Sequence, residues 1–167
     1  MFTTIAEFMQ AWTKEAELTL NVLKNLTDRS LSQPVVEGHR TLGRLAWHIT
    51  TTIPEMMERT GLKLDQIKPD APMPASTRVI EKAYADISNA LLEQIKRHWK
   101  DETLGVVDDM YSEKWERRFT LTALVQHQIH HRGQMTVLMR QAGLKVPSLY
   151  GPAKEDWGQY GMQPPEV

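Results

Sequence analysis

Hydrophobic and polar positions alternate with the period of an α-helix, about 3.6 residues, in four long stretches of the chain. The first runs from Thr4 to Leu26, where Thr4 and Glu7 have the spacing of a capping box. The second runs from Thr41 to Thr60 and the third from Thr77 to Trp99. The fourth covers Leu121 to Pro147, with Thr120 as its expected N-cap and with Gly143 and Pro147 as stop signals. These patterns predict four amphipathic helices.

In three segments the sequence pattern predicts the secondary structure less clearly. Pro54 lies inside the second pattern, which predicts either a kinked helix or a shorter helix that ends near Thr52. Residues 100–119 show short apolar alternation around Gly105, compatible with a small hairpin or with extended chain. The tail, residues 144–167, is rich in aromatic side chains. We therefore expect the tail to pack over one end of the helices rather than to be disordered.

Length and composition fit a single all-α domain that spans residues 1–167. The chain is 41% hydrophobic and 25% charged, and its formal net charge is −1. This balance gives no electrostatic basis for binding nucleic acid or an acidic membrane. No stretch approaches the length of a membrane span, and the N-terminus lacks the basic start of a signal peptide. The absence of cysteine excludes disulfides and thiolate metal ligands and is compatible with a reducing cytoplasm.

Two histidines in the fourth pattern are the main candidates for chemistry. His127 and His131 are four positions apart, so a helix places them about 40° apart on one face. Two imidazoles in this arrangement can bind one metal ion, although the residues between them include no carboxylate that could serve as the base of a zinc protease. A partly exposed helical face is the alternative interpretation. His48 lies at the edge of the apolar face of the second helix, where it is either a ligand or a hydrogen-bonded core histidine.

The segments HQIHHRGQMTVLMRQAGLKVPSLYGP and LAWHI resemble the DinB/YfiT-like superfamily of metalloenzymes, and the resemblance covers almost the whole chain. It implies a four-helix bundle with up-down-down-up topology and long connections. It also implies a metal site made by His48, His127 and His131. Members of that family are commonly cytoplasmic dimers. Characterised relatives include transferases that use bacillithiol, mycothiol or glutathione, and a mycothiol-dependent isomerase.

Three neutral imidazoles suit Zn²⁺ or Ni²⁺, and also Co²⁺, Fe²⁺ or Mn²⁺, and leave a coordination position for water or a thiol. Our first hypothesis is a metal-dependent enzyme that transfers a low-molecular-weight thiol to a small electrophile. A metal-dependent hydrolase or isomerase is the second, and a stress-related, dimeric metal-binding protein without catalysis is the third. An acidic thiol needs nearby cations, for which Arg132 or the pair Arg117 and Arg118 are candidates. His130 points away from both His127 and His131 and is interpreted as supporting or surface-exposed. His39 and His98 are not expected to be ligands.

Overall fold

The computed structural model describes residues 1–64, 67–68 and 70–166 and is mostly helical, as predicted. Four long helices form most of it: α1 (Ile5–Lys24), α2 (Leu42–Glu58), α3 (Thr77–His98) and α4 (Arg117–Gln141). In the described part of the chain there are also three short 3-10 helices: η1 (Asp28–Ser32), η2 (Asp101–Gly105) and η3 (Lys154–Tyr160). Strands β1 (Val107–Met110) and β2 (Glu113–Glu116) pair antiparallel, which confirms the hairpin alternative for this segment.

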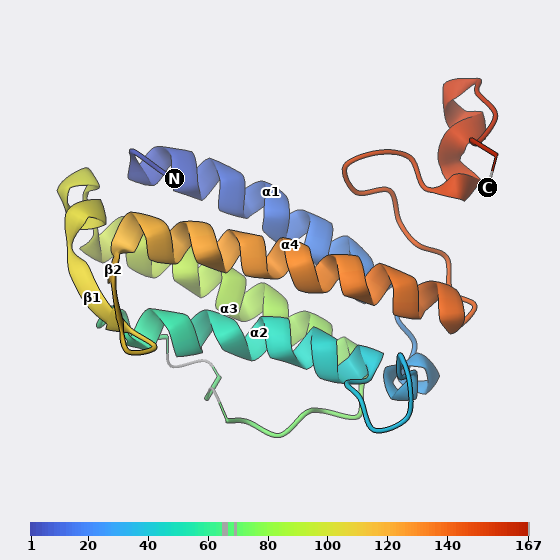
Figure 1. The fold of residues 1–167 in the computed structure, drawn as a ribbon, viewed down its shortest axis with the longest axis horizontal. Helices are drawn as coiled ribbons and strands as arrows, with labels where there is room; N and C mark the ends of the chain where they lie inside the picture. Colours follow the sequence, from blue (N-terminus) through green and yellow to red (C-terminus); the bar gives the residue numbers. More distant parts are fainter. Residues whose placement is uncertain (65–66, 69, 167) are drawn as a thin grey trace.

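The long helices lie side by side, so that each packs against two others (Figure 1). Helix α1 contacts α3 and α4, and α2 also contacts α3 and α4. The apolar stripes that the sequence predicts face the space between them. Fully buried side chains there include Phe8, Trp12, Ile49, Tyr84 and Leu124. Burial of these stripes, at about 25 cal/mol for each Å² of apolar surface, is the main force that holds the helices together.

The predicted starts of α1 and α2 are confirmed. Thr4 and Glu7 form the capping box at the start of α1, and the Thr41 side chain accepts a hydrogen bond from the backbone of Arg44 at the start of α2. Helix α2 continues through Pro54 to Glu58, so the shorter alternative that ends near Thr52 is wrong. The continuation keeps the residues after Pro54 on the same helix as His48.

Helix α4 begins earlier than predicted. It starts at Arg117, directly after β2, so Thr120 lies inside the first turns and is not the N-cap. The cause is a set of contacts with distant residues: the Arg117 backbone donates to Val106, and its side chain donates to the carbonyl of Thr60. The predicted end is confirmed, because Gly143 has a φ of +72° and terminates the helix.

The connection between α1 and α2 is held close to the helices. A bridge pairs Pro34 with Thr41, and the backbone of Leu42 donates to the carbonyl of Gln33. Gly43 allows η1 to approach α2, because a Cβ at this position would lie 2.9 Å from the Cβ of Leu31. The connection therefore returns over the start of α2 and brings residues 35–40 beside it.

The tail lies near one end of α1 and α4, where the chain beyond α4 turns back over the helices (Figure 1). The hydroxyl of Tyr150 donates to the Glu15 carboxylate of α1 at 2.6 Å. Arg140 of α4 pairs with Glu155 of η3. These polar contacts tie the tail to the helices, but Tyr150 and Tyr160 are 59% and 60% exposed, so the expected packing of the aromatic tail is found only in part. Within the residues the structure describes, no helix is both long and apolar enough to cross a membrane.

Candidate metal centre

The structure brings the three predicted histidines together. His48 comes from α2, and His127 and His131 come from α4. The Nε2 atoms of His48 and His127 are 3.1 Å apart. One ring nitrogen from each of the three residues lies within 4.8 Å of the other two. Zinc–nitrogen bonds are about 2.1 Å long, and a cluster of three ring nitrogens this close together could hold a metal ion.

A buried glutamine fixes the register of the two helices that carry the histidines. The Gln128 side chain of α4 donates to the carbonyl of Ile49 in α2 at 2.8 Å. The hydroxyl of Tyr84 in α3 donates to the same amide at 3.1 Å. Because Gln128 follows His127 and Ile49 follows His48, this bond between helices holds the two histidines opposite each other. The same bonds satisfy a fully buried amide, which is costly to leave without partners.

Hydrogen bonds orient two of the three rings. His131 Nδ1 lies 2.7 Å from the side-chain oxygen of Gln134, an atom that only accepts, so this nitrogen carries the proton. His48 Nδ1 lies 3.4 Å from the Thr52 hydroxyl, whose own proton is donated to the His48 carbonyl. In both rings the proton on Nδ1 leaves the lone pair on Nε2. Metal-ligating histidines usually have such a partner on the other ring nitrogen.

His127 is the least satisfied member of the cluster. Its Nδ1 is buried and has no hydrogen-bond partner, while its Nε2 faces the Nε2 of His48. Two neutral rings can place only one proton between these atoms. An ion bound by both Nε2 atoms would take up both lone pairs, with the proton of each ring on Nδ1. The donor set of three imidazoles suits a divalent transition metal.

The local environment keeps these imidazoles neutral at pH 7. Burial lowers the pKa of His127 to about 3, with smaller effects from His131, His48, His130 and Arg40. Burial also lowers the pKa of His48 to about 4, and the Arg40 and Arg44 guanidinium groups and His131 act in the same direction. The pKa of His131 is lowered, again mainly by burial. Neutral imidazole is the form that ligates metals.

Two cavities adjoin the cluster from different sides. The first, which we call the hairpin pocket, has a volume of about 350 Å³ and is lined by His48, Thr52, Glu55, Met56, Tyr111, Trp115, Ala123 and His127. The second, which we call the arginine pocket, has a volume of about 550 Å³ and is lined by Val35, His39, Arg40, Leu45, His131, Gln134 and Val137. Both volumes suit small molecules. The cluster therefore opens toward two separate spaces that differ in charge.

The structure places the predicted cations away from the centre or in ion pairs. Arg132 is buried and pairs with Glu15, Arg117 pairs with Asp108, and Arg118 pairs with Glu116. The expectation that one of these arginines serves an acidic ligand is not supported. Arg40, which was not predicted as a site residue from the sequence, lines a cavity together with His131, and both Arg40 and Arg44 act on His48.

The remaining histidines lie where the sequence analysis expected them, outside the cluster. His130 is exposed on α4, with its ring centroid 4.8 Å from that of His131. His39 is exposed, although it lines the arginine pocket. His98 lines a different cavity, beside Trp99.

Glu55 was not predicted as a site residue, although its spacing from His48 could have indicated it. Residues 48, 52 and 55 are spaced four and three apart, so they share one face of α2. Its partner Tyr111 has no such signal, because it reaches the pocket only through the turn of the hairpin. The Tyr111 hydroxyl donates to Glu55 at 2.8 Å.

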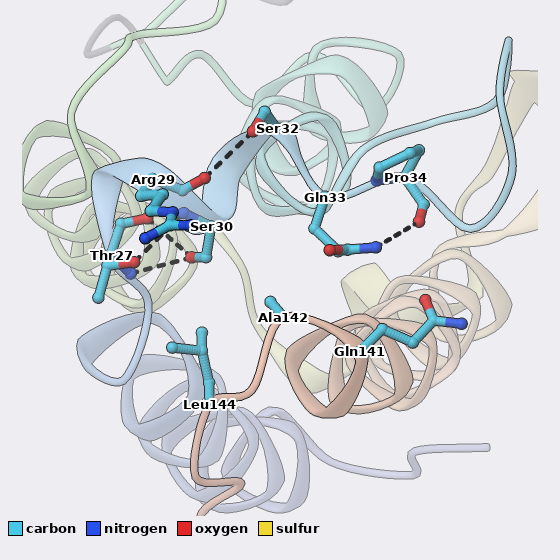
Figure 2. A pocket seen from close by; sticks show the side chains of 9 residues that line it. All are labelled: Thr27, Arg29, Ser30, Ser32, Gln33, Pro34, Gln141, Ala142 and Leu144. Atoms are coloured by element: carbon cyan, nitrogen blue, oxygen red, sulfur yellow. Dashed lines mark hydrogen bonds between the residues drawn. The ribbon is translucent and has the colours of Figure 1, made fainter.

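The largest cavity described here, about 670 Å³, lies between η1 and the end of α4, and none of the three histidines lines it (Figure 2). Its polar groups bond to one another: Thr27 and Ser30 cap each other, Ser32 donates to the carbonyl of Arg29, and Gln33 donates to that of Pro34. These polar groups therefore satisfy one another, and the cavity lies apart from the histidine cluster.

Comparison with known proteins places the chain in context. The model of the DinB family matches residues 1–165. An uncharacterised protein of Bacillus subtilis, YrdA, is 42% identical over 167 residues, which is the full length of both chains. The crystal structure of a DinB-like protein from Bacillus cereus has a TM-score of 0.86 and 46% identity, and the match covers 90% of this chain and 100% of that one. A second DinB-like protein, YjoA of Bacillus subtilis, has a TM-score of 0.68 at 20% identity, covering 87% and 97% of the two chains, and shows the fold alone.

Proposed function

The chain belongs to the DinB family, and on that premise we propose that it is a metal-dependent enzyme that transfers a low-molecular-weight thiol to a small electrophile. One observation carries the proposal. Three imidazoles that are neutral at pH 7 converge between two cavities, one with a cation and one with a carboxylate. This arrangement suits a two-substrate reaction at one metal, because it gives each substrate its own approach to the ion.

The residues around the centre then take specific roles. His48, His127 and His131 hold the ion, with Zn²⁺ or Ni²⁺ favoured over Co²⁺, Fe²⁺ or Mn²⁺. Thr52 and Gln134 keep the Nδ1 protons of His48 and His131 in place, so that the Nε2 lone pairs face the ion. A bound divalent ion lowers the pKa of a coordinated thiol or water and so supplies a nucleophile near neutral pH.

Arg40 supports the choice of an acidic thiol as the first substrate. It lines the arginine pocket together with His131, and its charge is felt by all three histidines. Some physiological low-molecular-weight thiols, such as glutathione and bacillithiol, carry carboxylates, and a guanidinium binds a carboxylate through two parallel hydrogen bonds. We therefore assign the thiol to the arginine pocket and the electrophile to the hairpin pocket.

A second candidate function is favoured by Glu55. A hydrolase or isomerase that uses metal-bound water benefits from a carboxylate that can accept a proton, and Glu55 lines the same cavity as His48 and His127. This candidate differs from the first in one measurable way: it needs no thiol for turnover.

The finer architecture and the assembly are also proposals. The contacts of α1 and α2 with α3 and α4, but with few between α1 and α2 or between α3 and α4, support the up-down-down-up bundle of the family. We propose that the protein is a cytoplasmic homodimer. Exposed apolar side chains at Val35, Val36 and Val137 support an interface on that side. A sedimentation mass near that of one chain at micromolar concentration would rule the dimer out.

The test of the thiol reaction uses protein loaded with Co²⁺, whose visible spectrum reports its ligands. Adding a small physiological thiol should change the spectrum and release about one proton per thiol near neutral pH. Both effects should be absent in His131→Ala and retained in His98→Ala, because His98 lies in a different cavity. If no physiological thiol changes the spectrum, the transferase is excluded and the reaction with water becomes the better candidate.

A further inference from the structure

We infer that the hairpin pocket binds the second substrate and selects small aromatic or aliphatic molecules that are neutral or cationic and carry a hydrogen-bond donor. The donor meets Glu55, which lies at the end of the pocket away from the histidines. That the bound molecule is a substrate rests on the proposed function. The binding preference is argued from the pocket alone.

The pocket has an apolar body between two polar ends. At one end lie His48 and His127, and at the other lies Glu55. Because a helix rises about 1.5 Å per residue, the Cα atoms of His48 and Glu55 are roughly 10 Å apart along α2. The walls between them come from Met56, Trp115 and Ala123. The volume of about 350 Å³ fits one ring with a short substituent.

The carboxylate of Glu55 is fixed in position. Its Oε2 accepts from the Tyr111 hydroxyl at 2.8 Å, and its Oε1 accepts from Arg59 Nε at 3.2 Å. The Arg59 guanidinium lies over the Tyr111 ring, 4.3 Å from the centroid. An ionised carboxylate has about four acceptor positions, so two remain for a ligand. Arg59 does not line the pocket, and the ligand therefore meets the negative partner of this ion pair.

The turn between β1 and β2 has a strained backbone, and this turn places Tyr111 against Glu55. Tyr111 and Ser112 both have positive φ, 55° and 69°, in a two-residue turn where Asn-Gly is the usual choice. Positive φ costs a side chain such as tyrosine about 1 kcal/mol. The contacts that hold Tyr111 there are those with Glu55, Arg59 and Trp115. The strain is thus associated with the Glu55 end of the pocket, and unfavourable backbone conformations often gather in binding sites.

The charges of the two cavities divide the ligands between them. Arg40 lines the arginine pocket, whereas Glu55 is the carboxylate of the hairpin pocket. A carboxylate on the second substrate would be repelled from the hairpin pocket and left without a donor among its apolar walls. An amine, amide or hydroxyl finds an acceptor there. The second substrate therefore differs in charge from the acidic thiol.

The test uses three probes of nearly identical shape: benzamidinium, benzamide and benzoate. With the zinc-loaded protein, benzamidinium and benzamide should bind, and benzoate should bind at least about tenfold more weakly, as expected when one charged hydrogen bond is lost. Glu55→Gln should remove most of this difference while leaving the zinc content unchanged. If benzoate binds as well as benzamidinium in the unaltered protein, the charge preference is wrong.

A pair of matched variants on α4 locates the probes. Ala123→Phe fills the hairpin pocket, and Val137→Phe adds the same side chain in the arginine pocket. Ala123→Phe should abolish probe binding and Val137→Phe should leave it unchanged, with the zinc content the same in both. The reverse pattern would overturn the assignment. Any benzoate that binds by ligating zinc is recognised by its loss in His131→Ala. Because no thiol is present, failure of the thiol reaction and failure of this inference are separate results.

Discussion

Two clusters of buried polar side chains lie next to each other on α4, and they differ in whether their polar atoms have partners. Arg132 is 1% exposed and donates to the carbonyl of Glu15, to its carboxylate, to the Thr19 hydroxyl and to Tyr150. The neighbouring cluster of histidines contains a buried nitrogen without a partner and two Nε2 atoms that face each other. Adjacent residues on one helix thus serve opposite purposes.

The difference shows that the role of a buried polar group can be recognised from its hydrogen-bond partners. A fully bonded group, such as Arg132, joins α1, α4 and the tail and leaves nothing for a ligand. A cluster in which ring nitrogens converge with fewer protons than lone pairs leaves part of its acceptors unsatisfied until something binds there. The comparison therefore assigns structure to Arg132 and ligand binding to His131, although both are buried side chains of the same helix.

The largest effect should come from breaking the bonded cluster. Arg132→Met leaves the Glu15 carboxylate buried without its main partner, and the loss of one member of a buried ion pair costs about 3 to 5 kcal/mol. Urea unfolding of the metal-free protein measures this change. The control is Arg140→Met, which removes an exposed ion pair with Glu155 and should change stability little. Equal effects of the two variants would contradict the distinction.

The second largest effect should come from removing a ligand in the other cluster. His127→Ala should lower metal affinity by at least about a hundredfold, because even the loss of a supporting partner costs about 10- to 100-fold. It should leave the urea stability of the metal-free protein unchanged or slightly higher, since it removes an unsatisfied group. Chelator competition and elemental analysis measure the affinity. His39→Ala is the control, and an equal loss of metal in that variant would refute the ligand assignment.

A smaller effect on metal affinity should follow from changing a partner of a ligand. Gln134→Leu removes the acceptor that holds the Nδ1 proton of His131, and the affinity should fall about 10- to 100-fold without loss of the site. Gln126→Leu changes an exposed glutamine of the same helix and should have no effect. A Gln134→Leu variant with unaltered affinity would show that the tautomer of His131 is fixed by something else.

Local patterns in the sequence predict most of the helices, and contacts between distant residues explain what they miss. Periodicity and the capping box located α1, because both depend on neighbours within one turn. The start of α4 was missed because Arg117 is fixed by Thr60 and Asp108, and no local signal reports those contacts. Thr120, which looks like a cap in sequence, is buried in the observed helix.

The same distinction between local patterns and long-range contacts applies to the residues of the metal centre. The spacing of His127 and His131 places them on one face of a helix, so the pair is visible in the sequence. His48 joins them across α2 and α4, and only the resemblance to a family singled it out. Arg132 looked like a free cation because its partner, Glu15, is 117 positions away. Residues that meet only in the folded chain leave no mark in a single sequence.

The smallest effect concerns the pH dependence of the metal-free protein. The folded-state pKa values of His48 and His127 are about 4 and about 3, below the unfolded value near 6.5. As pH falls below 6.5, the unfolded chain binds protons that the folded chain does not, so the free energy of unfolding decreases. The contribution is fully present above pH 6.5 and is lost as pH falls through 4 and 3.

The useful window is pH 6.5 to 5, where carboxylates contribute little to the change. Partial exposure of the two rings reduces the effect, and we expect a loss on the order of 1 kcal/mol across this window. Urea unfolding at several pH values in a chelating buffer measures it. His127→Gln should flatten the profile, whereas His39→Gln, at an exposed position, should leave it unchanged. A flat profile in the unaltered protein would mean that the rings of the cluster are as well solvated as free histidine, and the contrast with Arg132 would then disappear.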